Sequence, residues 1–380
     1  MPTARVAGVF VLALVVYAYG STSEVSWLFL LAYWLWAMLA AAAVYAAWNR
    51  PRRIRASSGV GRRAVHPDSP LDWLPAPVVR GMPAKSHFEG DGALVRITLR
   101  SRRGTRGPAL LRGRVGPVDF RIGVGAVGEP GLSREFVLEH LERGVLRLED
   151  LMLEAGDPLG LFRRRIALGS SERAVVLPRF AALGAGDRPR EFEAALAAPR
   201  AGSGNEILGV REYQRGDPLR RIHWRLSARH GDLVVREFEP PGVRVLTVLL
   251  DPAPASRAAA DQIARLAASE VWDCLREGGR VALWAPGLEP STPAEGRSLW
   301  ALLEWLARYP GGLPVADVAP PAAGDAVAIT AGGGGELLDA LTGLRWRGAA
   351  ARVWMVGDAV HDQQPGVPTR RVGLVWPLSE

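Results

Sequence analysis

The sequence predicts a multidomain protein: an N-terminal transmembrane helical hairpin, a small β-sandwich and a C-terminal α/β domain with a doubly wound sheet. Apolar residues dominate 1–48, and short strand-like runs bounded by Gly and Pro fill 87–170. Over 243–380, apolar runs alternate with amphipathic helical stretches, which is typical of a parallel sheet covered by helices. The intervening segments, 49–86 and 171–242, are predicted to be a basic Pro/Gly-rich linker and a connector.

Two apolar stretches, 6–20 and 25–48, predict the two transmembrane helices. A spanning helix needs about 20 apolar residues, so the second stretch is long enough and the first is short. Arginines follow the second stretch at positions 50, 52, 53 and 55. Because positive residues stay on the cytoplasmic side, we predict a multi-pass protein of the inner or plasma membrane with its soluble part in the cytoplasm. A cleaved signal peptide ending at 18–20 is the alternative for the first stretch.

Composition limits the classes of partner and cofactor. The formal net charge is +8, yet Lys85 is the only lysine, and no basic motif interleaved with aromatic residues indicates nucleic-acid binding. Cys274 is the only cysteine, which excludes a disulfide within the chain and a metal centre built from several thiolates. We therefore predict no nucleic-acid partner and no cofactor.

The soluble part divides by its periodicity. The clearest strands of the predicted β-sandwich are 93–100, 118–124 and 145–148. In the α/β domain, apolar runs predict strands at 243–250, 281–284, 326–329, 353–356 and 372–375. Apolar residues at three- and four-residue spacing predict helices at 256–277, 299–309 and 337–344.

The densest cluster of charged and aromatic residues lies at 204–239, here called the signature segment. Its candidate site residues are Glu206, Arg211, Tyr213, Gly216, Asp217, Arg220, Trp224, Ser227 and Arg229. One interpretation is a structural network that joins the two folded units. It predicts that Asp217 pairs with Arg220 or Arg229, or caps the turn after it, and that Trp224 is buried against the α/β domain. The alternatives are a surface that binds a protein partner and a pair of catalytic carboxylates.

The same segment resembles the signature of the domain-of-unknown-function 58 family. The matching positions are Gly204, Glu206, Gly209, Arg211, Tyr213, Gly216, Asp217, Arg220, Ile222, Trp224, Ser227, Ala228 and Arg229. The motif Asp-Pro-Leu-Gly-Leu-Phe at 157–162 looks like the family's approach to this signature, and two leading membrane helices are usual in the family. The resemblance implies partnership with a MoxR-type AAA+ ATPase and with a transglutaminase-like membrane protein. It also implies a C-terminal domain similar to the von Willebrand factor A domain.

A von Willebrand factor A domain holds Mg²⁺ through Asp-x-Ser-x-Ser after its first strand, together with a later Thr and Asp. Here Asp251 keeps the first carboxylate, but Ala253, Ala255 and Ala331 stand where the further oxygen ligands would be. One carboxylate cannot hold Mg²⁺ tightly. We therefore predict the fold without the metal, with a degenerate site at Asp251.

Together these features predict a non-enzymatic, membrane-anchored scaffold or adaptor that docks a cytoplasmic partner, with a MoxR-type ATPase as the leading candidate. An enzyme that uses the carboxylates of residues 206–239 is one alternative. A metal-dependent adhesion module of the von Willebrand factor A type is the other.

Overall fold

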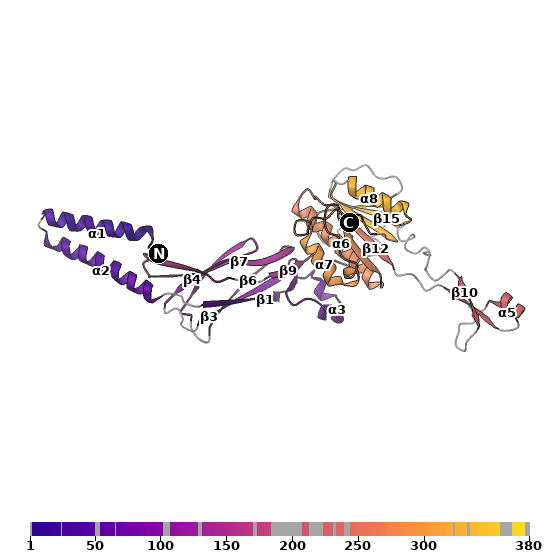
Figure 1. The fold of residues 1–380 in the computed structure, drawn as a ribbon, viewed down its shortest axis with the longest axis horizontal. Helices are drawn as coiled ribbons and strands as arrows, with labels where there is room; N and C mark the ends of the chain where they lie inside the picture. The colour runs from indigo at the N-terminus through magenta and orange to yellow at the C-terminus, as the bar shows by residue number, and fades with distance from the viewer. Residues whose placement is uncertain are drawn as a thin grey trace. The chain divides into compact units, whose positions relative to one another are not determined.

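The computed structural model describes residues 2–23, 25–49, 54–64, 66–101, 107–127, 131–169, 173–183, 207–212, 223–230, 233–238, 244–321, 324–332, 335–357 and 367–376. The chain forms two compact units, Met1–Leu177 and Pro178–Glu380. Each unit is described by itself, and Figure 1 labels several elements of each.

The first unit begins with two antiparallel helices, α1 (Ala4–Ser23) and α2 (Ser26–Trp48). Their 20 and 23 residues are long and apolar enough to cross a membrane. At 1.5 Å per residue they measure about 30 and 35 Å, close to the thickness of a bilayer's hydrocarbon core. The first helix is longer than predicted because the hydroxyls of residues 21–23 donate to the carbonyls of Ala18 and Tyr19, which satisfies the last turn internally.

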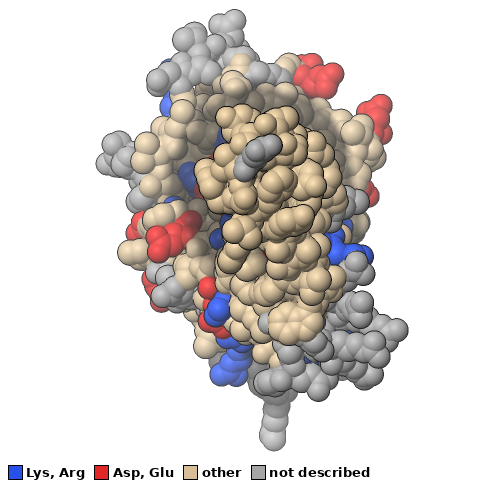
Figure 2. Space-filling model, turned by 90° about the vertical axis from the view of Figure 1, so that its left-hand side faces the viewer, with Lys and Arg blue, Asp and Glu red and all other residues tan. Residues whose placement is uncertain are grey.

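The outer surface of this hairpin is apolar. Large side chains are exposed on it, including Leu30 (64%), Trp27 (63%) and Trp34 (76%). Figure 2 shows no Lys, Arg, Asp or Glu over most of the hairpin that faces the viewer. Apolar exposure on this scale is unfavourable in water and suits the interior of a lipid bilayer.

Two β-sheets follow in the first unit. The smaller sheet has the order β1–β3–β6, formed by Ile54–Ala64, Gly92–Ser101 and Leu132–Leu138. The larger has the order β2–β9–β7–β4–β5, with β8 also paired to β7; its strands are Ser86–Phe88, Arg173–Leu177, Gly144–Gly156, Ala109–Val115, Val118–Val124 and Arg163–Ala167. The pairings are antiparallel except for that of β2 with β9. A 3-10 turn (Pro70–Asp72) and the short helix α3 (Ala76–Arg80) lie between β1 and β2.

The two sheets share one hydrophobic core. Strand β3 shows strict alternation, because Val95, Ile97 and Leu99 are buried while Arg96 between them is exposed. Their side chains belong to the same cluster as Leu111 of β4 and residues of β5, β6 and β7 from both sheets. This shared core is the β-sandwich that the short alternating runs predicted.

The sandwich extends beyond its predicted limits of 87–170. Residues 54–64, assigned to the linker from their Arg, Gly and Ser content, form strand β1 against β3. Ile54, Ala56 and Val60 pack on the core, and their even spacing is the periodicity that composition concealed. At the other end, strand β9 places residues 173–177 of the predicted connector in the larger sheet.

The second unit contains a parallel sheet. Its order is β13–β12–β14–β15–β16, formed by Arg280–Trp284, Val245–Leu250, Asp325–Thr330, Ala350–Val356 and Thr369–Val372. All four ladders are parallel. In chain order this is second, first, third, fourth and fifth, which is a doubly wound arrangement whose order reverses between β12 and β14. The apolar run at 372–375 predicted the last strand, but β16 begins three residues earlier, at Thr369.

Helices α6 (Arg257–Arg276), α7 (Leu299–Arg308) and α8 (Gly335–Trp346) follow strands β12, β13 and β14, with the 3-10 turn Glu295–Arg297 before α7. Ser256 and Ser298 cap α6 and α7 by accepting hydrogen bonds from Ala259 and Ala301. These caps explain why the predicted starts of both helices agree with the structure.

Helix α6 also anchors the start of the second unit. The Ser269 hydroxyl accepts a hydrogen bond from the backbone of Ala181 (3.2 Å), and the Asp273 carboxylate accepts one from Leu183 (3.2 Å). Phe180 packs on Trp272 with ring centroids 5.8 Å apart. Residues 178–183, predicted as connector, are therefore part of the α/β unit.

Candidate functional site

The described part of the signature segment is a small ribbon with one short helix. Strand β10 (Ile207–Glu212) pairs antiparallel with β11 (Val234–Phe238), and helix α5 (Trp224–His230) precedes β11. Arg211 faces Val235 in the register of the ribbon. The same pairing brings residues 212 and 234 together.

Ser227 fastens the helix to the ribbon. The backbone of Val234 donates a hydrogen bond to the Ser227 hydroxyl (2.9 Å), and the backbone of His223 donates to the Val234 carbonyl (2.8 Å). The Ser227 hydroxyl lies 3.2 Å from the His223 carbonyl. Ser227 and Val234 are 7% and 9% exposed. Among the candidate residues, Ser227 therefore has a structural contact that accounts for its small polar side chain.

The prediction that Trp224 is buried was wrong. Its side chain is 63% exposed, and Arg225, Ala228 and Arg229 on the same helix are exposed as well. The helix has seven residues, and Ser227 occupies the side that meets β11. At about 100° per residue, Arg225 and Arg229 then fall on the side opposite Ser227, while Ala228 and Trp224 lie on the flank of the helix, about 100° and about 60° from Ser227.

Five further candidates fall elsewhere in the signature segment. Glu206, Tyr213, Gly216, Asp217 and Arg220 lie outside the described residues. The predicted pairing of Asp217 with Arg220 or Arg229, and its capping of the following turn, lie outside them too. The observed part of the site is thus the α5 face formed by Trp224, Arg225, Ala228 and Arg229, here called the signature face.

A second candidate position lies at the carboxyl edge of the parallel sheet. Asp251 follows β12 and is 3% exposed, and Thr330, the last residue of β14, is 2% exposed. One carboxylate oxygen of Asp251 accepts hydrogen bonds from the Thr330 hydroxyl (3.0 Å) and the Ala331 backbone (3.2 Å). The other accepts from the Ala253 backbone (3.1 Å). The Tyr309 hydroxyl donates to the Asp251 carbonyl.

This geometry does not fit a hard divalent cation. Mg²⁺ requires about six oxygen ligands in octahedral geometry. The Asp251 carboxylate and the Thr330 hydroxyl are hydrogen-bonded to each other and to backbone amides. Ala253 and Ala331 present N–H donors to the carboxylate, not oxygen ligands to a cation. No group of three or more His, Cys, Asp or Glu side chains gathers in a metal-binding arrangement in the part of the chain that the structure describes. Asp251 instead joins the ends of β12 and β14, the two strands where the sheet order reverses.

The opposite edge of the sheet holds a cluster that the sequence did not reveal. The Arg244 guanidinium donates to Asp325 (2.8 Å) and also pairs with Glu277. Burial lowers the pKa of Arg244, but the neighbouring Cys274 sulfur and the carboxylates of Asp325 and Glu277 raise it above its ordinary value, so the guanidinium stays charged. Burial raises the pKa of the neighbouring Cys274 thiol to about 11. A neutral, buried thiol is a poor nucleophile, so this cluster suits a structural role. Arg244 and Asp325 lie 81 positions apart, which no local pattern connects.

Comparison with known proteins supports the resemblance of the signature segment. The sequence model of the family described as "Protein of unknown function DUF58" matches residues 209–299. The matched range includes α5, β11, β12 and all of α6.

One relative is the protein described as "Uncharacterized protein YeaD" from Bacillus subtilis (strain 168), which is 25% identical over 161 residues. The alignment covers 42% of this chain and 40% of that protein, so the chain matches well under half of the relative's length.

Proposed function

We propose that the protein is a non-enzymatic, membrane-anchored scaffold whose signature face docks a cytoplasmic protein partner. The supporting observation is the 63% exposure of Trp224 on a helix that Ser227 holds to the ribbon. A large exposed aromatic beside arginines is the composition of an interaction hot spot. The partner we propose is a MoxR-type AAA+ ATPase, with a transglutaminase-like membrane protein as the third member of the assembly.

The charge of the signature face indicates what the partner presents. Arg225 and Arg229 are four residues apart and exposed, so their guanidinium groups can meet an acidic surface on the partner. Exposed pairs of this kind act mainly on the association rate and weaken with salt. The aromatic ring of Trp224 would supply the desolvated centre of the contact.

The two apolar helices suit a membrane anchor, and the arginines after α2 favour a cytoplasmic soluble part. We also infer that the α/β unit is von Willebrand factor A-like, because its sheet is parallel and Asp251 stands at the end of its first strand. The bonding of Asp251 disfavours the metal-dependent adhesion alternative. The enzyme alternative depends on carboxylates at 206–239, of which Glu206 and Asp217 lie outside the described residues.

The docking proposal is tested with purified full-length protein and the MoxR-type ATPase of the same genome. Trp224→Ala should weaken binding by tenfold or more, since hot-spot truncations cost about 2 kcal/mol or more. Trp346→Ala is the matched control, because Trp346 is 87% exposed on α8. Equal binding by wild type and Trp224→Ala, with normal melting of both, would refute the signature face as the docking surface.

Orientation has its own test. A reporter fused after Glu380 should behave as cytoplasmic in cells. Activity of a phosphatase that folds only in the periplasm, fused at the same position, would reverse the proposed topology.

A further inference from the structure

The motif Asp-Pro-Leu-Gly-Leu-Phe at 157–162 forms a tight loop between β7 and β8. Asp157 is 7% exposed, and its carboxylate accepts hydrogen bonds from the backbones of Leu159 (2.9 Å), Leu161 (3.2 Å) and Phe162. Three backbone donors fix the loop around one side chain and engage its negative charge. The loop is therefore a rigid feature of the sandwich, which the function proposed above leaves unused.

Both polar ends of the hairpin are fastened beside this loop. At the start of α1, the Thr3 backbone donates to the Leu161 carbonyl (2.9 Å), and its hydroxyl contacts the same oxygen (2.8 Å). At the end of α2, the Asn49 amide donates to the carbonyls of Pro108 and Gly156 (both 3.3 Å) and accepts from Gly107 (2.8 Å). Asn49 is 1% exposed. If α1 and α2 span a bilayer, the loop lies at the level of the lipid headgroups.

Aromatic residues mark the same level. Trp48, the last residue of α2, is 52% exposed and lies against Tyr45 with ring centroids 6.0 Å apart. Amphipathic rings of this kind collect where the hydrocarbon core meets water.

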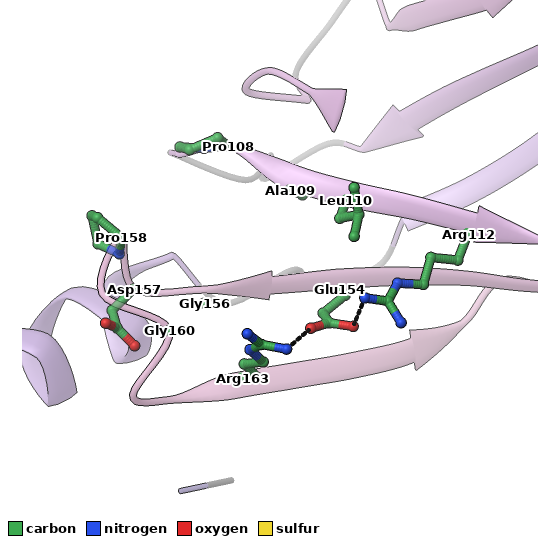
Figure 3. A pocket seen from close by; sticks show the side chains of 10 residues that line it. All are labelled: Pro108, Ala109, Leu110, Arg112, Glu154, Gly156, Asp157, Pro158, Gly160 and Arg163. Atoms are coloured by element: carbon green, nitrogen blue, oxygen red, sulfur yellow. Dashed lines mark ion pairs between the residues drawn. The ribbon is translucent and has the colours of Figure 1, made fainter. Parts of the chain in front are cut away.

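An open cavity of about 300 Å³ adjoins the loop (Figure 3). That volume is at the lower end of the range of small-molecule sites. Its wall includes Pro108, Arg112, Glu154, Pro158, Gly160 and Arg163. In Figure 3, Arg112 of β4 and Arg163 of β8 approach Glu154 of β7 from two sides.

The cavity wall holds two arginines, Arg112 and Arg163, and two carboxylates, Glu154 and Asp157, and two further arginines, Arg165 and Arg5, lie close to it. The Glu154 carboxylate, only 8% exposed, pairs with Arg112 (3.5 Å), Arg163 (3.3 Å) and Arg165 (3.2 Å). Three guanidinium groups thus share the Glu154 carboxylate as their ion-pair partner. A fourth cation is close, because a Cβ at Gly160 would lie 3.3 Å from the Arg163 guanidinium and 3.6 Å from that of Arg5.

One donor in this cavity lacks an acceptor. The Nε of Arg112 is buried and has no hydrogen-bond partner among the residues that the structure describes. A buried guanidinium N–H without an acceptor is costly. The Arg112 side chain as a whole is 32% exposed, so a bound anion could approach the accessible part of its guanidinium.

We propose that this cavity binds the phosphate of an anionic lipid headgroup. The inference rests on the membrane anchoring proposed above and adds a ligand to it. Arginine clusters recognise phosphate through charge-assisted hydrogen bonds, and basic pockets beside transmembrane helices bind anionic headgroups. Free phosphate offers the same chemistry, but the attachment of both hairpin ends beside the cavity favours a ligand held in the membrane.

The test uses full-length protein in a non-ionic detergent, without any protein partner. The protein is titrated separately with dihexanoyl phosphatidylglycerol, dihexanoyl phosphatidylcholine and inorganic phosphate, and native mass spectrometry counts the bound molecules. One phosphatidylglycerol should bind, and Arg112→Gln should weaken it tenfold or more. Arg147→Gln is the matched control. Arg147 lies on β7, the strand of Glu154, but seven residues or about 23 Å away from Glu154.

Arg112→Lys guards against a folding defect, since it keeps the charge and loses the Nε donor. It should melt like wild type and bind phosphatidylglycerol several-fold more weakly. Equal binding of phosphatidylglycerol by wild type and both Arg112 variants overturns the proposal, as does equal loss in Arg147→Gln. Inorganic phosphate or phosphatidylcholine binding as well as phosphatidylglycerol overturns the assignment to anionic lipid. The docking of a protein partner at the signature face is not touched by any of these outcomes.

Discussion

A buried ion pair between α6 and β15 gives a quantitative test of how the α/β unit is held together. Glu270 and Arg352 are each 1% exposed and form a direct salt bridge. The second carboxylate oxygen of Glu270 accepts a hydrogen bond from the Trp354 indole (2.8 Å), and Arg370 lies 5.6 Å from the centre of the Trp354 ring. Glu270→Ala would remove the acceptor for two buried donors at once.

Breaking a buried pair by removing one partner costs about 3–5 kcal/mol. For a unit of this size, each kcal/mol lowers Tm by about 2–4 °C. Glu270→Ala should therefore lower the Tm of the α/β unit by roughly 6–20 °C. The double variant Glu270→Leu/Arg352→Met should recover part of that loss, because neither charge is then buried alone, while the Trp354 indole N–H still lacks its acceptor.

The assay is thermal unfolding of the full-length protein in detergent, followed by circular dichroism and by tryptophan fluorescence. Glu304→Ala is a suitable control, because Glu304 pairs with Arg308 at 3.5 Å on exposed helix surface and such pairs contribute little. A drop of less than 2 °C for Glu270→Ala, or a double variant no more stable than the single one, would refute the reasoning.

Three further predictions follow from single contacts. Cys274, with a pKa of about 11, should resist iodoacetamide at pH 8 until the protein is unfolded. Because the thiol of the unfolded protein ionises at lower pH than the buried one, the neutral Cys274 thiol contributes fully to the free energy of unfolding below about pH 9. This contribution falls by up to about 3 kcal/mol as the pH rises towards 11, and Cys274→Ser should not show the loss. Gly156→Ala should destabilise the sandwich by about 1–3 kcal/mol, because a Cβ at this position would lie 2.3 Å from the Phe162 carbonyl oxygen. Gly123→Ala is the control and should be tolerated, because nothing lies within 4 Å of a Cβ at Gly123. Asp251→Ala should lower the free energy of unfolding by about 3 kcal/mol or more, because it leaves three hydrogen-bond donors unpaired. Millimolar Mg²⁺ should leave the Tm of the wild-type protein unchanged. An upward shift of Tm with Mg²⁺ that Asp251→Ala abolishes would contradict the hydrogen bonding described here.

The sequence predicted elements well where periodicity and caps agree. The helix predicted at 256–277 is α6, Arg257–Arg276, because Ser256 supplies the cap and apolar residues recur on the face against the sheet. Strand β1 was missed because arginines and glycines between its apolar residues resemble a linker. Its apolar positions have meaning only opposite β3, some 30 to 50 residues later in the chain.

The candidate site was predicted less well than the fold, for a physical reason. The motif shows that the signature segment is rich in charged and aromatic residues. It does not show which side of the seven-residue helix α5 contacts strand β11. Ser227 occupies the side against β11, and Trp224, three residues earlier on the flank of the helix, is exposed where burial was expected. Likewise, the Arg112–Glu154–Arg163 cluster joins three strands, and nothing local to any one of them predicts it.

The distribution of charge connects the two proposed surfaces. Among the described residues, eight acidic side chains are buried but only two arginines are: Glu89, Asp91, Glu154, Asp157, Asp251, Glu270, Asp273 and Asp325 against Arg143 and Arg352. Several of these acids accept hydrogen bonds from backbone amides and so fasten loops, as Asp157 and Asp251 do.

Acids enclosed in this way are unavailable for recognition at the surface. The chain already has a net charge of +8, so its accessible surface is more cationic than that number states. A protein with such a surface attracts anionic partners and repels cationic ones, with a strength that salt reduces. The phosphate of a lipid headgroup at the hairpin and an acidic protein surface at the signature face are both ligands that this distribution selects. Raising the salt concentration should therefore weaken both interactions, while Trp224→Ala should weaken only the second.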